Sequence, residues 1–218
     1  MCGRFSLTAG ADRIARHFGV QDLPQLAPRY NIAPSTDIAV IRQEHDNRQC
    51  VLMRWGLVPA WSKEPKTAYS TINARAETVA DKPAFRDAFR KRRCLIPATG
   101  FYEWQQRDGE KIPHYIQLRD GDLFAFAGLW ERWQQGEQVL ESCTIIVTTA
   151  NELMQPLHPR MPVILPVGHY ADWLNPAHTK QQLLQLLAPF DSSVLEAFPV
   201  SRLVNNPRND SAECMVPA

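Results

Sequence analysis

The sequence predicts an α+β fold in which a predominantly antiparallel, barrel-like β core carries short helices at its periphery. Three observations favour this fold class. Short apolar segments separated by turn residues dominate the middle of the chain. Helical periodicity is confined to short stretches and does not alternate regularly with strands, which argues against a doubly wound parallel sheet. The 218 residues are 44% hydrophobic and contain no internal repeat or linker, so they can bury a substantial core.

The first third of the chain combines one short helix with short strands. Ile14, Ala15 and Phe18 recur at helical spacing before Gly19, which predicts a helix over Ala11–Phe18. Alternating or short apolar runs predict the strands Gly3–Leu7, Asp37–Gln43 and Cys50–Val58, the last two joined by a polar turn. Prolines mark expected loops over Pro24–Ser35 and Pro59–Ser70, and the next segment is Thr71–Val79.

The central region supplies most of the predicted β structure. Turn residues at Gly100, Asp108-Gly109, Asp120-Gly121 and Gly136 separate its apolar segments. The expected strands are Cys94–Pro97, Phe101–Gln105, His114–Leu118, Leu123–Trp130, Val139–Thr149, Met161–Leu165 and Val194–Ser201. Short helices are expected over Pro83–Phe89, Asn151–Leu157, His169–Leu174 and Thr179–Leu187, and a loop over Val204–Asp210.

Composition excludes several classes of protein. The net charge is +1, so any argument for nucleic acid must be local. The five cysteines are widely spaced without a CxxC pair, which argues against a disulfide scaffold or a zinc site. No apolar run approaches the roughly 20 residues of a membrane span, and the N-terminus lacks a secretion signal. Walker, Rossmann, G-x-S-x-G and HExxH patterns are absent. We expect a cytoplasmic protein without metal, cofactor or membrane attachment.

Cys2 has the most distinctive chemistry in the chain. A small residue after Met1 is what the general Met-removing machinery accepts, so the mature chain would begin with Cys2. That residue would then carry an amine and a thiol, which condense with an aldehyde to an imine and close to a thiazolidine. The amine titrates at roughly 8 and the thiol at about 8.5, so both are partly nucleophilic near neutral pH. The alternative is a buried or incidental cysteine at a frayed terminus.

Glu103 and His158 are candidates for proton transfer. Glu103 lies among three aromatic residues on an expected strand, where burial on both faces would raise its pKa. The alternative is an edge-strand carboxylate that points to water. His158 lies between Pro156 and Pro159, which fix the backbone and suit a proton shuttle, although a loop histidine is often only a surface residue.

Polar and basic side chains suggest contacts to nucleic acid. Asn73 and Arg75 lie two apart, so an extended backbone would project both to one face, where Glu77 could pair with an arginine. Alternatively they form a structural loop network. The basic run from Arg86 to Arg93 is either a solvated helix face or a phosphate-binding strip. Trp61, next to Lys63, could stack on a base or fill the core.

Several windows taken together resemble one family, the SOS-response-associated peptidase (SRAP) family. The resemblance runs in order from residue 2 to about residue 214, which implies a single domain over residues 1–218 with the SRAP fold. The matching windows are Met1–Phe5, Arg29–Pro34, Trp55–Pro59, Ile72–Thr78, Gly100–Trp104, Thr148–Asn151, His158–Pro162 and Val204–Asn206.

The resemblance implies a sensor of abasic sites in single-stranded DNA that crosslinks through its N-terminal cysteine and protects the site during the DNA damage response. The implied catalytic residues are Cys2, Asn73, Glu103 and His158. The implied DNA contacts are Arg4 and Arg75, with Pro34 and Trp61 as wedge residues and Arg160 from the His158–Pro162 window. Relatives often carry a second aromatic residue at the position of Ser62, which puts the wedge of this chain in question.

Two other functions fit the residues alone. Cys2 could be the thiol nucleophile of an N-terminal-nucleophile amidase or peptidase that removes its own Met1. The chain could also be a non-catalytic module that binds single-stranded nucleic acid. We expect a monomer for each of these functions. If the protein crosslinks to DNA, we expect the DNA-bound protein to be associated with the nucleoid.

Overall fold

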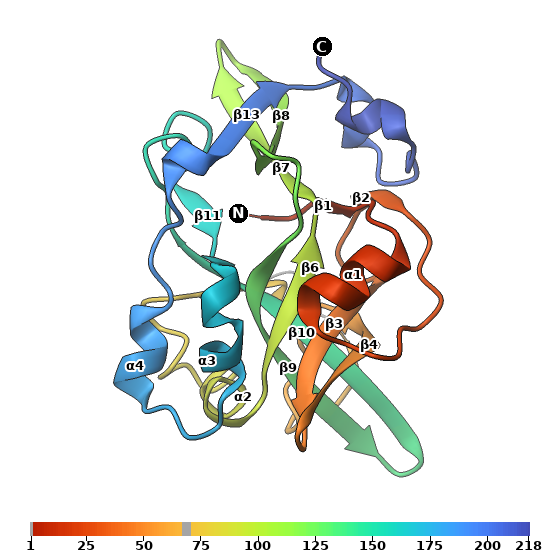
Figure 1. Ribbon diagram of the computed structural model, residues 1–218, viewed down its shortest axis with the longest axis vertical. Coiled ribbons are helices and arrows are strands. Elements are labelled where there is room, and N and C mark those ends of the chain that lie inside the picture. Colours follow the sequence, from red (N-terminus) through yellow and green to blue (C-terminus); the bar gives the residue numbers. More distant parts are fainter. Residues whose placement is uncertain (1, 67–70) are drawn as a thin grey trace.

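The computed structural model describes residues 2–66 and 71–218. Five of its strands close into a barrel (Figure 1). β9 pairs with both β6 and β10, and β10 also pairs with β4, which completes the ring. The β10–β4 pair is parallel and the other pairs of the ring are antiparallel. The barrel strands are β3 (Asp37–Glu44), β4 (Asn47–Trp55), β6 (Arg93–Ala98), β9 (Phe124–Gln135) and β10 (Gln138–Thr149).

A second, five-stranded antiparallel sheet adjoins the barrel. Its strands, in spatial order, are β13 (Leu195–Pro199), β8 (Glu110–Leu118), β7 (Gly100–Arg107), β1 (Phe5–Leu7) and β2 (Arg29–Ile32). β6 runs almost directly into β7, with Thr99 between them, so one chain segment connects the barrel to this sheet. Three short strands extend the barrel sheet, namely β5 (Asn73–Arg75), β11 (Arg160–Pro162) and β12 (Ile164–Leu165).

Short helices lie around the two sheets (Figure 1). Gly19 ends α1 with a left-handed φ of 66°, a conformation that glycine adopts without steric cost. None of the helices in the described part of the chain is long and apolar enough to cross a membrane. The α-helices are α1 (Ala11–Phe18), α2 (Arg86–Lys91), α3 (Tyr170–Leu174) and α4 (Lys180–Gln185). The 3₁₀ turns are η2 (Val167–His169), η3 (Ser192–Val194), η4 (Arg202–Asn205) and η5 (Ala212–Met215).

The predicted fold class is confirmed, and most predicted elements are found within a few residues of their expected bounds. Strand β2 is the clearest omission, because it lies in the expected proline loop and forms by pairing with distant β1. Thr71–Val79 is extended only over β5, and turns follow it. Asn151–Leu157 forms turns in place of a helix. Residues 67–70 of the expected loop Pro59–Ser70 lie outside the described residues.

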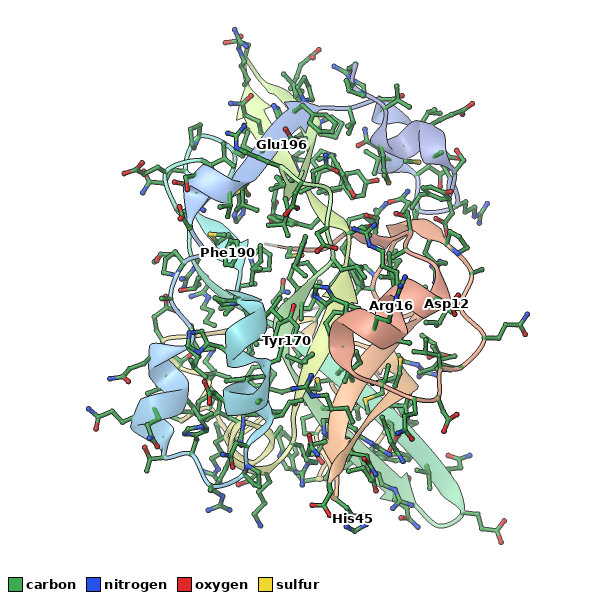
Figure 2. The ribbon with its side chains drawn as sticks, viewed as in Figure 1. Asp12, Arg16, His45, Tyr170, Phe190 and Glu196 are labelled. Carbon is green, nitrogen blue, oxygen red and sulfur yellow. The ribbon has the colours of Figure 1, made fainter. Side chains whose placement is uncertain are left out.

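Aromatic side chains join the second sheet to the barrel. Phe5 of β1 packs edge-on against Trp55 of β4 and Phe126 of β9, with ring centroids 5.2 and 5.7 Å apart. Tyr170 of α3 lies on the helical side of the molecule (Figure 2). Its ring stacks on that of Phe18, with centroids 5.4 Å apart. Cys94 and Cys143 are fully buried, as the apolar runs around them predict. The two sheets and the α-helices therefore share one main core. A second, smaller cluster joins β7 and β8 to the C-terminal segment and contains Tyr102, Tyr115, Val200, Val204 and Cys214.

Gly100 allows two strands of the second sheet to come close together. A Cβ atom on Gly100 would lie 2.2 Å from Cζ of Tyr115 on β8. The Tyr115 hydroxyl shares a hydrogen bond of 2.7 Å with Ser6 Oγ, which in turn lies 3.0 Å from Thr99 Oγ1. The glycine is required here by lack of space, and the Tyr115 ring holds a buried network of hydroxyl groups.

Gly100→Ala should destabilise the protein by about 1–3 kcal/mol or more, because the new methyl group overlaps the Tyr115 ring. Urea unfolding followed by tryptophan fluorescence measures the change. Gly168→Ala is the control, since a Cβ atom on Gly168 would meet nothing within 4 Å and this variant should unfold like the wild type. Equal midpoints for Gly100→Ala and the wild type would contradict this account of the packing.

The basic run from Arg86 to Arg93 has no single role. Arg93 is buried, and its guanidinium donates to the backbone carbonyls of Phe89, Arg90, Trp173 and Asn175 at 2.7–2.8 Å. It thereby joins the end of α2 to the end of α3. Arg92 forms a 2.6 Å ion pair with Glu131. The interpretation of the whole run as a solvated face or as a phosphate strip is therefore wrong for Arg92 and Arg93, while Arg86, Arg90 and Lys91 are exposed.

Arg93→Lys should destabilise the protein by about 2–4 kcal/mol, because one ammonium group cannot reach four carbonyls that a planar guanidinium spans. The free energy of unfolding in urea gives the effect. Arg86→Lys, on the same helix but exposed, should stay within about 0.5 kcal/mol of the wild type. Similar losses for both variants would show that Arg93 is not a structural anchor.

Candidate active site

Cys2 is brought next to β7 by the pairing of β1 with that strand. Phe5 lies opposite Phe101, and the Tyr102 N–H donates to the Arg4 carbonyl at 2.9 Å. Continued toward the N-terminus, the same antiparallel register places Gly3 opposite Glu103. Cys2 is the next residue, and it lies within electrostatic reach of the Glu103 carboxyl group. The Cys2 side chain is fully buried and packs within the main apolar core. Cys2 is therefore buried, as the alternative to a reactive terminus predicts, and its reactivity stays a prediction.

Glu103 is a buried carboxyl group on a central strand. Only 3% of the residue is exposed, and β7 has β8 on one side and β1 on the other, so the edge-strand alternative is wrong. Burial raises the pKa of Glu103, and the nearby charge of His158 opposes that rise. A carboxyl group with a raised pKa can hold and deliver a proton closer to neutral pH.

The Cys2 thiol is strongly affected by the same surroundings. Burial raises the pKa of this thiol well above its usual range, and the negative charge of Glu103 raises it further. A hydrogen bond from the Arg4 backbone N–H acts in the opposite direction. The thiol is consequently protonated at neutral pH, and deprotonation needs a base close by. Glu103 is the carboxylate within electrostatic reach.

An open cleft of about 540 Å³ gives access to this region. One wall comes from the β7–β8 hairpin and the other from the segment before β11. The Trp104 indole N–H donates to Asn205 Oδ1 at 2.7 Å, which joins the hairpin to η4. The cleft is lined by Glu103, Trp104, Gln106, Lys111, Leu157, His158, Pro159 and Asn205. The structure thus brings two predicted catalytic residues, Glu103 and His158, into one cleft.

His158 is oriented by its own backbone. Its N–H donates to the Met154 carbonyl at 2.9 Å, which closes the preceding turn. Its ring Nδ1 lies 3.0 Å from the Arg160 backbone nitrogen, from which it can accept, and 3.1 Å from the Arg160 carbonyl oxygen, to which it can donate. The two contacts require different tautomers, so the backbone of Arg160 fixes the orientation of the ring and not the position of its proton. The ring is held at the edge of the cleft, and its role in proton transfer stays a prediction.

Asn73 lies on β5, which pairs in parallel with β10. The side chain is buried, and neither its Oδ1 nor its Nδ2 has a hydrogen-bond partner within residues 2–66 and 71–218. Buried amides are nearly always hydrogen-bonded, so an amide without partners among the described residues makes Asn73 a candidate binding position. Arg75, two residues on, is exposed. Asn73 and Arg75 are not among the described residues that line the cleft.

Arg160 is held by Glu77. Its two terminal nitrogens lie 2.5 and 2.9 Å from the two carboxylate oxygens. Glu77 therefore pairs with an arginine, as predicted, although it reaches that arginine from a turn and not from a strand. Hydrogen bonding to Arg160 lowers the pKa of Glu77. Arg160 comes directly after His158 and Pro159, which line the cleft. This ion pair therefore joins the turn after β5 to the wall of the cleft.

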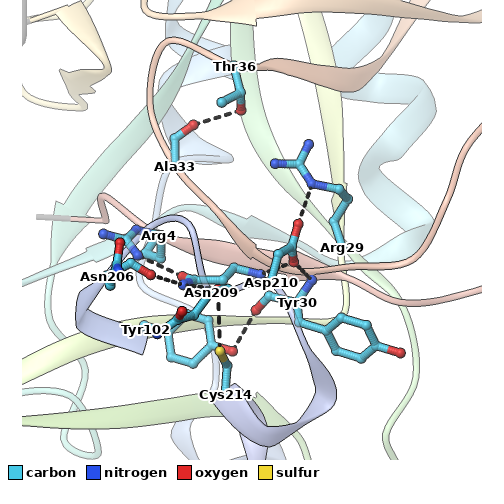
Figure 3. A network of polar contacts seen from close by, with 11 residues as sticks. Arg4, Arg29, Tyr30, Ala33, Thr36, Tyr102, Asn206, Asn209, Asp210 and Cys214 are labelled. Carbon is cyan, nitrogen blue, oxygen red and sulfur yellow. Dashed lines mark hydrogen bonds and ion pairs between the residues drawn. The ribbon is translucent and has the colours of Figure 1, made fainter. Parts of the chain in front are cut away.

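Arg4 is built into a network that the sequence reasoning missed (Figure 3). Its Nη1 donates to Asn31 Oδ1 at 2.7 Å and to the Val204 carbonyl at 2.8 Å. The buried Asn31 amide also donates to the carbonyls of Val204, Asn206 and Asn209. These contacts fasten the C-terminal segment, residues 202–215, to β1 and β2. The family motifs Arg29–Pro34 and Val204–Asn206 contain residues from both sides of this network. The sequence alone assigned no structural role to these residues.

Pro34 and Trp61 lie on loops outside the cleft lining. Pro34 is in the turn between β2 and β3, where Ser35 has a φ of 67°. Trp61 is 67% exposed, so the core-filling alternative is wrong. Its loop is fixed from behind, since Trp133 Nε1 donates to the Ser62 carbonyl at 2.7 Å. The described residues contain no cluster of histidine, cysteine or carboxylate side chains suited to a metal ion.

Proteins of known sequence and structure resemble this chain along its whole length. Abasic site processing protein YoaM of Bacillus subtilis (strain 168) is 48% identical over 221 residues, which cover 99% of this chain and 97% of that protein. Abasic site processing protein HMCES of Gallus gallus is 33% identical, covering 100% of this chain and 78% of that protein. A crystal structure of a Bacteroides thetaiotaomicron protein, 30% identical, superimposes with a TM-score of 0.89, and both chains are fully covered. The family model described as SOS response associated peptidase (SRAP) matches residues 1–207, and the chain belongs to this family.

Proposed function

We propose that this protein crosslinks covalently to abasic sites in single-stranded DNA through Cys2, after removal of Met1. The observation that carries the proposal is the buried Glu103 carboxyl, which lies beside Cys2 and lines the same cleft as His158. The relatives named abasic site processing proteins support the abasic sugar as substrate. The product would shield the site from strand cleavage.

The reaction balances without an oxidant or a cofactor. The opened abasic sugar carries an aldehyde, and the Cys2 amine adds to its carbon. Loss of one water gives an imine. The thiol then adds across the C=N bond, so that a carbon–sulfur bond forms and the thiol proton is transferred to nitrogen. The five-membered thiazolidine should last longer than the open imine, because hydrolysis must first reopen the ring.

The pKa shifts suggest the order of the steps and the role of Glu103. Because burial keeps the Cys2 thiol protonated, the amine attacks first and sulfur follows. Protonated Glu103 can donate to the ring oxygen on ring opening and regain a proton from the anomeric hydroxyl group, which becomes the aldehyde oxygen. It can then donate this proton to the departing hydroxyl group of the amine adduct. The resulting carboxylate can then accept the thiol proton during ring closure. One buried group thus serves as acid and then as base.

The other residues of the site have positioning roles in this mechanism. His158, oriented by the backbone of Arg160, can exchange protons at the cleft edge. The Asn73 amide, which lacks partners among the described residues, is suited to hold the Cys2 amine or the opened sugar. Exposed Arg75 can clamp a phosphate without reading sequence. Arg4 and Arg160 are engaged within the protein, so we assign them to shaping the site next to the phosphates that they are expected to contact.

Pro34 and Trp61 are proposed to separate bases next to the lesion. Trp61 presents most of its indole to solvent on a loop fixed by Trp133, so a base can stack on it without any rearrangement of the core. Ser62 supplies its carbonyl to that anchor, a role that does not require an aromatic side chain. This chain has Ser62 where relatives often carry a second aromatic residue, so its proposed wedge contains one aromatic residue, Trp61.

Incubation with an oligonucleotide that contains one abasic site should give a slowly migrating band on a denaturing gel. Cys2→Ala should remove the band, and so should an N-terminal extension that prevents Cys2 from becoming the first residue. Intact mass should show the loss of Met1 and an adduct lighter by one water than the sum of its parts. Cys50→Ala is the matched cysteine control and should crosslink like the wild type.

Other outcomes of the same assay identify the alternatives. An amidase would leave no DNA adduct but would hydrolyse an amide substrate in a Cys2-dependent manner. A binding module would shift DNA only on a native gel, and Cys2→Ala would bind equally well. Either result would exclude the crosslinking mechanism.

Glu103→Gln should slow crosslinking about 100-fold or more, the range of general acid–base catalysis. It should also stabilise the fold in a pH-dependent manner. Burial raises the pKa of Glu103 in the folded chain, so its stability contribution is present below the unfolded pKa of roughly 4.3 and is lost as the pH rises through the folded pKa. The variant should therefore gain stability over the wild type at about pH 8 and lose that gain near pH 4.

Urea unfolding and crosslinking time courses at matched pH measure both effects. The exposed Glu137→Gln variant is the control and should follow the wild type at each pH. A Glu103→Gln variant that crosslinks at the wild-type rate would remove this residue from the mechanism.

A further inference from the structure

A second cavity, of about 580 Å³, opens between α2 and α4, and none of its lining residues belongs to the cleft of Glu103. Four nitrogen-bearing side chains line it, namely those of Arg86, Arg90, His178 and Lys180. Its remaining lining is the Asp87 carboxylate, Ala80, Pro176 and the almost completely buried side chains of Phe89 and Leu183. The cavity thus combines a mainly cationic rim, which includes one carboxylate, with an apolar floor.

The two arginines of the rim are available for a ligand. The Arg86 side chain has no ion pair or hydrogen bond within residues 2–66 and 71–218. Arg90 lies 3.8 Å from Asp87, a loose contact between two side chains that are more than half exposed. Lys180 is paired with Asp81 at 2.7 Å, and both groups are exposed, so water already competes for them. The arginines at the end of the same run, in contrast, are used by the fold.

The combination of rim and floor selects one class of ligand. Guanidinium groups bind phosphate oxygens through paired donors. An apolar floor offers nothing to a bare inorganic anion, but it can cover the face of a sugar or a base. We propose that this cavity is a second, non-covalent site that binds a nucleoside phosphate, supplied by the DNA strand that flanks the crosslinked residue. The choice of DNA as the source rests on the proposed function.

Chain geometry makes the flanking strand a suitable source. Ala80 lines the cavity and follows Arg75 by five residues, so their Cα atoms lie no more than about 18 Å apart. A stacked strand advances about 3.4 Å per nucleotide, so it covers this distance in about five nucleotides. A strand held at Arg75 can therefore reach the cavity with a short flank.

The test compares crosslinking rates, at limiting protein, for abasic oligonucleotides with three or ten nucleotides on the 5′ or the 3′ side. With the wild type, lengthening one flank should raise the rate about five- to tenfold. Arg86→Ala/Arg90→Ala should abolish this gain and match the wild type on short flanks. For the long-flank oligonucleotide, the slope of log rate against log salt concentration should be shallower in the double variant than in the wild type. The expected difference is about 0.7 for each phosphate that the variant no longer binds. Arg16→Ala/Arg132→Ala, two exposed arginines off the cavity, is the charge-matched control.

A second arm detects the ligand without any crosslinking. Thymidine 5′-monophosphate should shift the backbone amide resonances of α2 and α4, and the double variant should not show these shifts. Mononucleotide binding without a flank effect would support the site and overturn the flanking strand as its source. No shifts and no flank effect would overturn the site itself. Failure of every oligonucleotide to crosslink would count against the proposed function alone, since the resonance shifts still test the cavity.

Discussion

Backbone pairing between β1 and β7 is the constraint on which the site depends. β1 has three residues, and its register opposite Phe101 and Gly100 determines where the residues before it lie. A slip of one residue would move every side chain to the opposite face of the sheet and separate Cys2 from Glu103. The close approach of Tyr115 to Gly100 and the hydroxyl network of Ser6 hold this register. The position of Cys2 relative to Glu103 is therefore determined by packing around Ser6, Gly100 and Tyr115, some residues away from Cys2.

The site forms where two sheets meet, and each sheet supplies different parts. The second sheet carries Glu103, with Cys2 just before β1, while His158 lies in the segment that precedes β11 of the barrel sheet. The C-terminal segment completes the cleft wall, because Asn31 and Arg4 hold it against β1 and β2. Segments from both ends of the chain and from its middle thus form the cleft and its surroundings. This explains why the family pattern extends over nearly the whole sequence.

Sequence reasoning succeeded where local signals were sufficient. Helical spacing before Gly19 predicted α1 with its observed bounds, and apolar runs predicted the barrel strands. It failed where a distant partner decides the outcome. Nothing local distinguishes Arg93 from Arg86, because only the docking of α3 supplies the carbonyls that bury Arg93. Strand β2 and the role of Asn31 likewise depend on partners far along the chain. The candidate residues came from motif windows, but the amide of Asn73 without partners and the burial of Glu103 required the fold.

The buried amide of Asn73 has a consequence for how long a complex would survive. An amide that has left water without gaining a partner among the described residues lowers the stability of the free protein by about 1–3 kcal/mol. A sugar oxygen or an amine that reached it would remove this penalty. The occupied protein would then resist heat, denaturant and proteolytic attack better than the empty one. If the proposed crosslink forms, this added stability would slow its removal by unfolding or proteolysis.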